Sequence, residues 1–107
     1  MRKAAAVLIA AAALTSTAAW AQPGRLSDVD FLQASRCAGL ASSGKLGTSD
    51  PAMSNLVKSQ AMNRPLFIMD RSDEMQRDAK RAASRAGDIE KSRLSAELTG
   101  VCAQLKG

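Results

Sequence analysis

The chain has 107 residues, with 15 Lys and Arg, 10 Asp and Glu and no His, so its formal net charge is +5. Histidine is the usual general base near neutral pH and the commonest metal ligand. Its absence excludes Ser-His-Asp and Cys-His catalysis within this chain and argues against an ordinary zinc site. We therefore expect a protein that is not an enzyme, with no catalytic residues, no metal and no cofactor.

The first 21 residues have the pattern of a secretory signal peptide. Two basic residues precede an apolar run over residues 4–14, and Ala19-Trp20-Ala21 places small residues before a cleavage site after Ala21. A membrane anchor is the competing interpretation, but the segment approaches the ~20 apolar residues of a spanning helix only by including three hydroxyl residues. We predict a cleaved signal peptide at 1–21 and an exported domain at 22–107, periplasmic or secreted, with no transmembrane segment after cleavage.

Cleavage of the signal peptide changes what the rest of the composition means. The signal peptide holds two basic and no acidic residues, so the net charge falls from +5 to +3. Two cysteines remain, and in an oxidising compartment such a pair predicts a disulfide between Cys37 and Cys102. In the loop-entropy model a closure of this length stabilises the fold by roughly 4 kcal/mol, a large share of the stability of so small a domain.

The first predicted helix spans residues 28–42. Ser27 is a suitable N-cap, and Gly44 suits the left-handed conformation that ends many helices. We expect an apolar side that comprises Val29, Leu32, Cys37 and Leu40, widened by Phe31, Ala34, Ala38 and Ala41. The expected polar side comprises Asp28, Ser35 and Ser42. Because the apolar arc is so wide, this helix should be buried over much of its surface.

Three further helices are predicted. The second spans 51–62, with Asp50 as N-cap and Pro51 at its first position, and it stops before Pro65. The third, over 65–86, carries a narrow inward seam that comprises Ile68, Ser72, Met75, Ala79, Ala82 and Ala86. The fourth, over 89–105, is weakened at Gly100. Its apolar face comprises Leu94, Leu98, Val101, Cys102 and Leu105.

No strand pattern competes with these helices, because alternating apolar and polar residues over five or more positions do not occur. The predicted fold class is an all-α, small bundle of three to five helices with one disulfide linking the first and last helices.

Two features of the third predicted helix are candidate partner-binding surfaces. Leu66, Phe67, Ile68 and Met69 are four successive apolar residues, which cannot all face one core, so part of this patch is expected at the surface. Arg77, Lys80, Arg81 and Arg85 recur at steps of three and four, which places them on one side of a helix. Such a stripe attracts phosphate, anionic lipid or an acidic protein. The plainer interpretations are a core wrapped on two sides and a solvated face countered by Asp78.

Carboxylates are the remaining option for catalysis. Asp70, Glu74 and Asp78 stand at helical spacing with Asp73 beside them, and a carboxylate pair could serve acid–base chemistry. A solvated face with interspersed arginines is the simpler interpretation.

The leading functional hypothesis is an exported, non-enzymatic helical protein that binds another macromolecule, with an envelope protein as its possible partner. Nucleic acid is not expected, because the protein is exported and the mature chain has only two aromatic residues for base stacking. A stress-conditional periplasmic chaperone is the alternative, since protonation of its acidic residues would raise an already positive charge. The chain is similar to small acid-stress chaperones of the bacterial periplasm in size, helicity and a single disulfide, but no motif carries that similarity. A small carboxylate-dependent hydrolase ranks third.

The signal peptide and the disulfide are tested together by intact mass after expression with the full leader. We expect a mature chain that begins at Gln22 and has a mass two hydrogens below the dithiol value, a difference that disappears on reduction. A secreted product that retains Met1, or an unchanged mass after reduction, would contradict these two predictions respectively.

Overall fold

The computed structural model describes residues 25–47 and 51–106, so the predicted signal peptide, its cleavage site and the Asp50 cap lie outside the described residues. The described chain forms α2 (Asp28–Ser42), α3 (Ala52–Gln60), α4 (Leu66–Arg85) and a last rod made of α5 (Asp88–Glu97), the π-helical η2 (Leu98–Cys102) and α6 (Ala103–Leu105). These are four helices without strands, and the prediction of an all-α bundle is confirmed.

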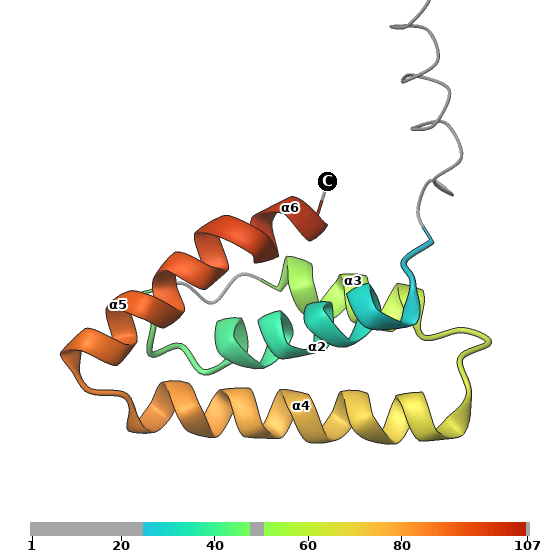
Figure 1. The fold of residues 1–107 in the computed structure, drawn as a ribbon, viewed down its shortest axis with the longest axis horizontal. Helices are drawn as coiled ribbons and strands as arrows, with labels where there is room; N and C mark the ends of the chain where they lie inside the picture. The colour runs from blue at the N-terminus through green and yellow to red at the C-terminus, as the bar shows by residue number, and fades with distance from the viewer. Residues whose placement is uncertain (1–24, 48–50, 107) are drawn as a thin grey trace, which may run out of the picture.

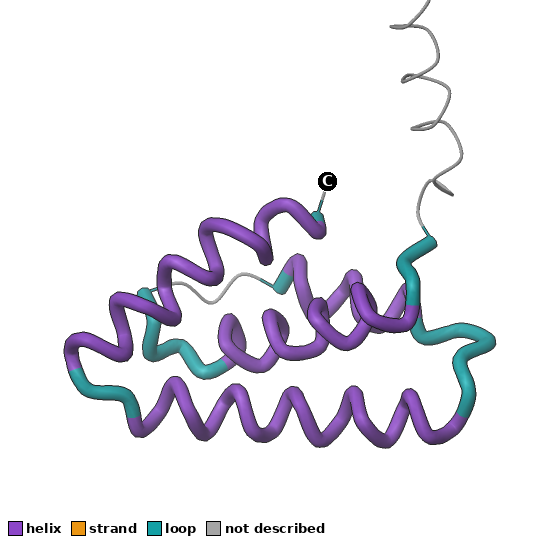
Figure 2. Tube along the Cα trace, in the orientation of Figure 1, coloured by secondary structure: helices purple, strands orange, loops and turns teal. Residues whose placement is uncertain are grey.

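Helix α2 occupies the centre of the bundle. It packs against α4 on one side, and against α3 and η2 on others. Figure 1 shows α4 running along one side of α2, while the rod from α5 to α6 crosses on the opposite side. The connections from α3 to α4 and from α4 to α5 are short loops, drawn in teal in Figure 2. A central position explains why α2 has so little polar surface along its length.

The ends of α2 follow the sequence prediction, but its buried side is rotated from the predicted one. The Ser27 side chain accepts a hydrogen bond from the amide of Asp30 at 3.1 Å, and Gly44 has a φ of 70°. Val29, expected in the core, is 76% exposed, whereas Ser35, expected on the polar side, is fully buried. The prediction was wrong at both positions because α4 covers the Ser35 side of α2 and nothing in the described structure covers the first turn at Val29.

Helices α2 and α4 approach closely because small residues face each other. A Cβ atom on Gly39 would lie 2.3 Å from the carbonyl oxygen of Gln76 and 2.9 Å from the Cβ of Ala79. Nearby, the hydroxyls of Ser35 and Ser72 share a hydrogen bond of 2.6 Å. Both serines are therefore buried without an unsatisfied polar atom.

The inward seam of α4 differs from the predicted one at its C-terminal end. Ile68, Ser72 and Ala79 are buried as predicted, but Ala83 is buried and Ala82 is exposed. A period of 3.6 residues places the fourth residue after Ala79 on the inner side, and Ala83 meets Leu40 and Leu94 there. Because Ala82 and Ala83 are adjacent and identical, the sequence pattern could not show which of them is buried.

Arg64 joins the chain entering α2 to the end of α3, a role that the sequence did not reveal. Its side chain is only 2% exposed, and its guanidinium lies 4.5 Å from the centroid of the Phe31 ring. The guanidinium donates hydrogen bonds of 2.7 Å to a carboxylate oxygen of Asp28 and 2.7 Å to the carbonyl of Leu26. It also donates to the carbonyl of Gln60 at 2.8 Å, which explains why α3 can end at Gln60 and not at the predicted Met62.

The predicted disulfide is present and holds the last rod against α2. Cys37 and Cys102 are bonded, with their Cα atoms 5.7 Å apart, and both are buried. The rod is π-helical from Leu98 to Cys102, a segment that includes Gly100. The extra residue in this turn rotates later positions backward, so that Cys102 faces the core. Val101, predicted on the apolar face, is 42% exposed for the same reason.

A half-buried ion pair adds a second attachment beside the disulfide. The Arg36 Nε donates to a Glu97 carboxylate oxygen at 2.6 Å, its second nitrogen donates to the other oxygen at 3.0 Å, and Gln33 adds a bond of 3.3 Å. The Glu97 side chain is 19% exposed. The hydrogen bonds from Arg36, helped by its charge and by Gln33, hold the pKa of Glu97 below its ordinary value, although burial opposes this shift.

The close approach of α2 to α4 predicts a large effect of a single methyl group. Gly39→Ala should destabilise the protein by about 1–3 kcal/mol, because its Cβ would overlap the backbone of Gln76. Gly100→Ala is the matched control, since its Cβ would meet no atom within 4 Å, and it should cost little or be slightly stabilising. Urea unfolding of the two variants gives the measurement, and equal midpoints would show that the helices are not in close contact.

The Arg36–Glu97 pair predicts a specific acid dependence. Because the pKa of Glu97 is lower in the folded protein than in the unfolded chain, its contribution is present above the unfolded pKa of about 4.5 and is lost as the pH falls through the lower folded value. Glu97→Gln should cost about 1–2 kcal/mol at neutral pH and flatten this part of the pH profile. Glu74→Gln removes an exposed carboxylate with an arginine partner and serves as control. Parallel profiles for Glu97→Gln and the unmodified protein between pH 6 and pH 3 would contradict the prediction.

Candidate functional site

The outer face of α4 carries both candidate surfaces predicted from the sequence. Its inner face is occupied by α2, so side chains on the opposite side of the helix project away from the bundle. Leu66 and Arg85 are the first and last residues of α4. At a rise of 1.5 Å per residue, about 28 Å of helix separates them. The two candidate surfaces are therefore the two ends of one helix face.

The apolar surface at the start of α4 is half of the predicted patch. Leu66 is 76% exposed and Phe67 is 71% exposed, whereas Ile68 is buried and Met69 is partly buried. Met62, in the loop before α4, is also 70% exposed. Large exposed apolar side chains next to one another are unusual on a small domain and are typical of a contact surface. Leu66 and Phe67 are the members of the patch that remain candidates for partner binding.

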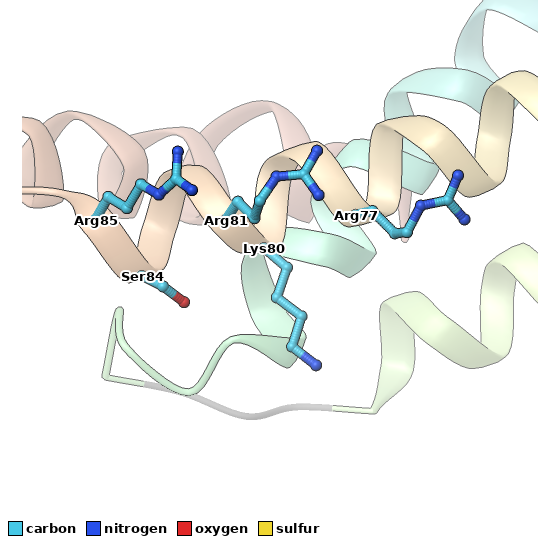
Figure 3. A pocket seen from close by; sticks show the side chains of 5 residues that line it. All are labelled: Arg77, Lys80, Arg81, Ser84 and Arg85. Carbon is cyan, nitrogen blue, oxygen red and sulfur yellow. The ribbon is translucent and has the colours of Figure 1, made fainter.

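The basic surface at the end of α4 comprises Arg77, Lys80, Arg81 and Arg85, all exposed, which line an open hollow together with Ser84. Figure 3 shows the three arginines in a row along the helix, whereas Lys80 leaves it in a different direction. One helical turn, about 6 Å, separates successive arginines. The structure thus brings the arginines together as predicted, and Lys80 extends the positive surface sideways.

One of these cations is already paired within the helix. Arg81 bonds to the carboxylate of Asp78, one turn earlier. Arg77, Lys80 and Arg85 make no ion pair with any described residue. Exposed pairs of the Asp78–Arg81 type contribute little stability. The surface therefore keeps cations that an anionic partner can approach without breaking an internal contact.

The carboxylates considered for catalysis are spread over the same exposed face. Glu74 bonds to Arg71 at 2.6 Å, and both side chains are more than half exposed. Asp78 bonds to Arg81. Glu74 and Asp78 are therefore each directed to an arginine and not to one another. A general acid of this kind needs burial or a like-charged neighbour to raise its pKa. This arrangement gives the hydrolase hypothesis no geometric support.

Among the other hollows of the described residues, one that the sequence did not indicate is formed by three separate helices. It lies beside the disulfide and is lined mostly by apolar side chains from α2, α3 and the last rod: Ala41, Met53, Leu98, Thr99, Cys102, Ala103 and Lys106. Its walls meet only because the rod crosses α2 at the disulfide. No local sequence signal could have identified it, since its residues come from three separate helices. Within the described chain, no cluster of three or more metal-ligating side chains is present.

None of the helices in the described part of the chain is long and apolar enough to span a membrane. No protein-family model matches this chain, and no curated protein or solved structure matches it either.

Proposed function

We propose that this protein is an exported, non-enzymatic helical module that binds another macromolecule of the cell envelope through the outer face of α4. The observation that carries the proposal is the exposure of Leu66 and Phe67 at the start of a helix whose other large apolar residues are buried or partly buried. Exposing two such side chains to water is unfavourable, and a partner that covers them regains that free energy.

The dimensions of the face suit a protein partner. A standard interface buries ~800 Å² on each side, which corresponds to a patch roughly 30 Å across. The outer face of α4 is about 28 Å long, so one partner can cover both ends. In that arrangement Phe67 enters an apolar pocket of the partner and contributes most of the binding free energy. Acidic groups of the partner face the arginines, and this attraction sets the orientation of the complex and its association rate.

Export is part of the proposal. The signal-peptide pattern at 1–21 supports it, and the Cys37–Cys102 disulfide is compatible with an oxidising periplasmic or extracellular location. A reducing compartment would remove the bond that holds the last rod to α2. A small domain with a modest core depends on such a bond more than a large one does.

A stress-conditional chaperone is the second candidate, and the Arg36–Glu97 pair is the observation that favours it. Protonation of Glu97 in acid removes one of the attachments that hold the rod to α2. Loosening of the rod exposes apolar surface around Leu98 and the disulfide. A chaperone of this kind acts on several unrelated clients and only at low pH, whereas the leading proposal requires one stoichiometric partner near neutral pH.

Affinity capture from native envelope extract, after crosslinking, distinguishes these functions. We expect one stoichiometric partner with the unmodified protein, and its loss with Phe67→Asp, because a charge in the apolar pocket costs several kcal/mol. Val29→Asp is the matched control: Val29 is equally exposed but lies on α2, so the partner should be retained. Arg81→Glu should weaken capture, and the exposed Lys58→Glu on α3 should not.

Three outcomes would contradict the leading proposal. Retention of the same partner by Phe67→Asp would remove the α4 face as its binding site. Equal loss with Val29→Asp would indicate a general effect of added charge. Capture of many unrelated proteins at low pH, together with suppression of their aggregation, would favour the chaperone.

A further inference from the structure

The positive charge of the mature chain is concentrated at one end of the molecule. Residues 77–93 contain six basic and three acidic residues, a net charge of +3. The rest of the chain after Ala21 contains seven of each, a net charge of zero. Residues 77–93 cover the second half of α4, its connection to α5 and the first turns of α5, which form one end of the bundle in Figure 1. We call this part the hairpin end.

The cations of the hairpin end are available to a partner. Two of its three acidic residues are already bonded to arginines, Asp78 to Arg81 and Glu90 to Arg93. The other cations, Arg77, Lys80, Arg85 and Lys91, are exposed and make no ion pair with another described residue. The loop after α2 adds exposed Lys45, since its neighbour Leu46 packs beside Ala83 of α4. Attraction of an anionic surface therefore requires no internal rearrangement.

The hairpin end also carries the most exposed large apolar residue in the described chain. Ile89 is 88% exposed, in the first turn of α5. It follows Arg85 by four residues, so the two Cα atoms lie within about 14 Å of each other. Its chain neighbours Asp88 and Glu90 are acidic, but Glu90 is bonded to Arg93, and Lys91 follows two residues after Ile89. An exposed apolar side chain close to lysines and arginines is the arrangement with which peripheral proteins enter the headgroup region of a bilayer.

We propose that the hairpin end docks on the surface of a bilayer that contains anionic lipid, with the cations on the headgroups and Ile89 inserted between them. The proposal rests on the proposed function only in taking the end of α4 as a binding surface. A bilayer suits these observations better than an acidic protein, because it offers negative charge and an apolar layer together. It also suits the arginines, which form a row and do not converge on one site (Figure 3). At this end the described surface has an open hollow and not an enclosed pocket for a single small anion.

Vesicle sedimentation with the purified mature protein tests the proposal. We expect binding to vesicles of mixed phosphatidylglycerol and phosphatidylcholine at about 0.05 M salt, its loss at about 0.5 M salt, and no binding to phosphatidylcholine alone. Arg77→Gln combined with Arg85→Gln should weaken binding about 25-fold, near fivefold for each charge at the surface. Ile89→Ser should weaken it a further fivefold or so, because the inserted side chain is lost.

Matched variants elsewhere separate docking at this end from a general charge effect. Lys58→Gln combined with Arg71→Gln removes the same charge from exposed positions outside residues 77–93, where Arg71 is bonded to Glu74. Val29→Ser removes an apolar side chain that is 76% exposed from α2. All of these should bind vesicles as the unmodified protein does, with unchanged helical circular dichroism. Equal weakening by the two double variants would overturn the proposal, as would equal binding to phosphatidylcholine alone.

Two further outcomes identify other ligands. Binding to soluble polyglutamate as tight as binding to vesicles, with neither changed by Ile89→Ser, would assign the hairpin end to an acidic polypeptide and overturn the bilayer. Displacement from vesicles by millimolar inorganic phosphate at constant ionic strength would assign it to a small anion. Since vesicles contain no protein, failure here leaves protein capture through Phe67 intact, and failure of that capture leaves vesicle binding intact.

Discussion

The close contact between α2 and α4 at Gly39 is the constraint on which the rest of the structure depends. The carbonyl oxygen of Gln76 occupies the space that any other side chain at position 39 would need. Seated this closely, α2 contacts α4 on one side and still contacts α3 and the last rod on others. The same contact fixes which side of α4 faces the bundle, and it leaves a complete helix face of about 28 Å exposed to a partner.

The other attachments compensate for a small core in which five alanines, two serines and a glycine are buried among the larger side chains. Small residues permit close helix approach but bury little apolar area, so they contribute little hydrophobic free energy. Arg64 supplies polar contacts where α2 begins. Where the last rod crosses α2, the Cys37–Cys102 bond and the Arg36–Glu97 ion pair hold the two together. The π-helical turn belongs to this arrangement, because it places Cys102 on the side of the rod that faces Cys37.

The proposed functions follow from the surface that this arrangement leaves over. The two ends of the α4 face differ in chemistry, with Leu66 and Phe67 at one end and the cations of the hairpin end at the other. A protein partner that covers the whole face and a bilayer at its basic end would both use the arginines, so the two proposals assign these cations to alternative contacts.

The sequence by itself determined the helices, their caps at Ser27 and Gly44, the disulfide pair and the exposure of part of Leu66–Met69, because each depends on local hydrogen bonding, helical period or the number of cysteines. Only the tertiary structure decided that Ser35 faces inward and Val29 outward, that Ala83 and not Ala82 completes the seam, and that Arg64 is buried. The face that a helix buries depends on the directions from which its neighbours approach. Nearly every side of α2 carries small or apolar side chains, so its sequence pattern could not specify which side is buried. The packing of α4 on Gly39 decides it.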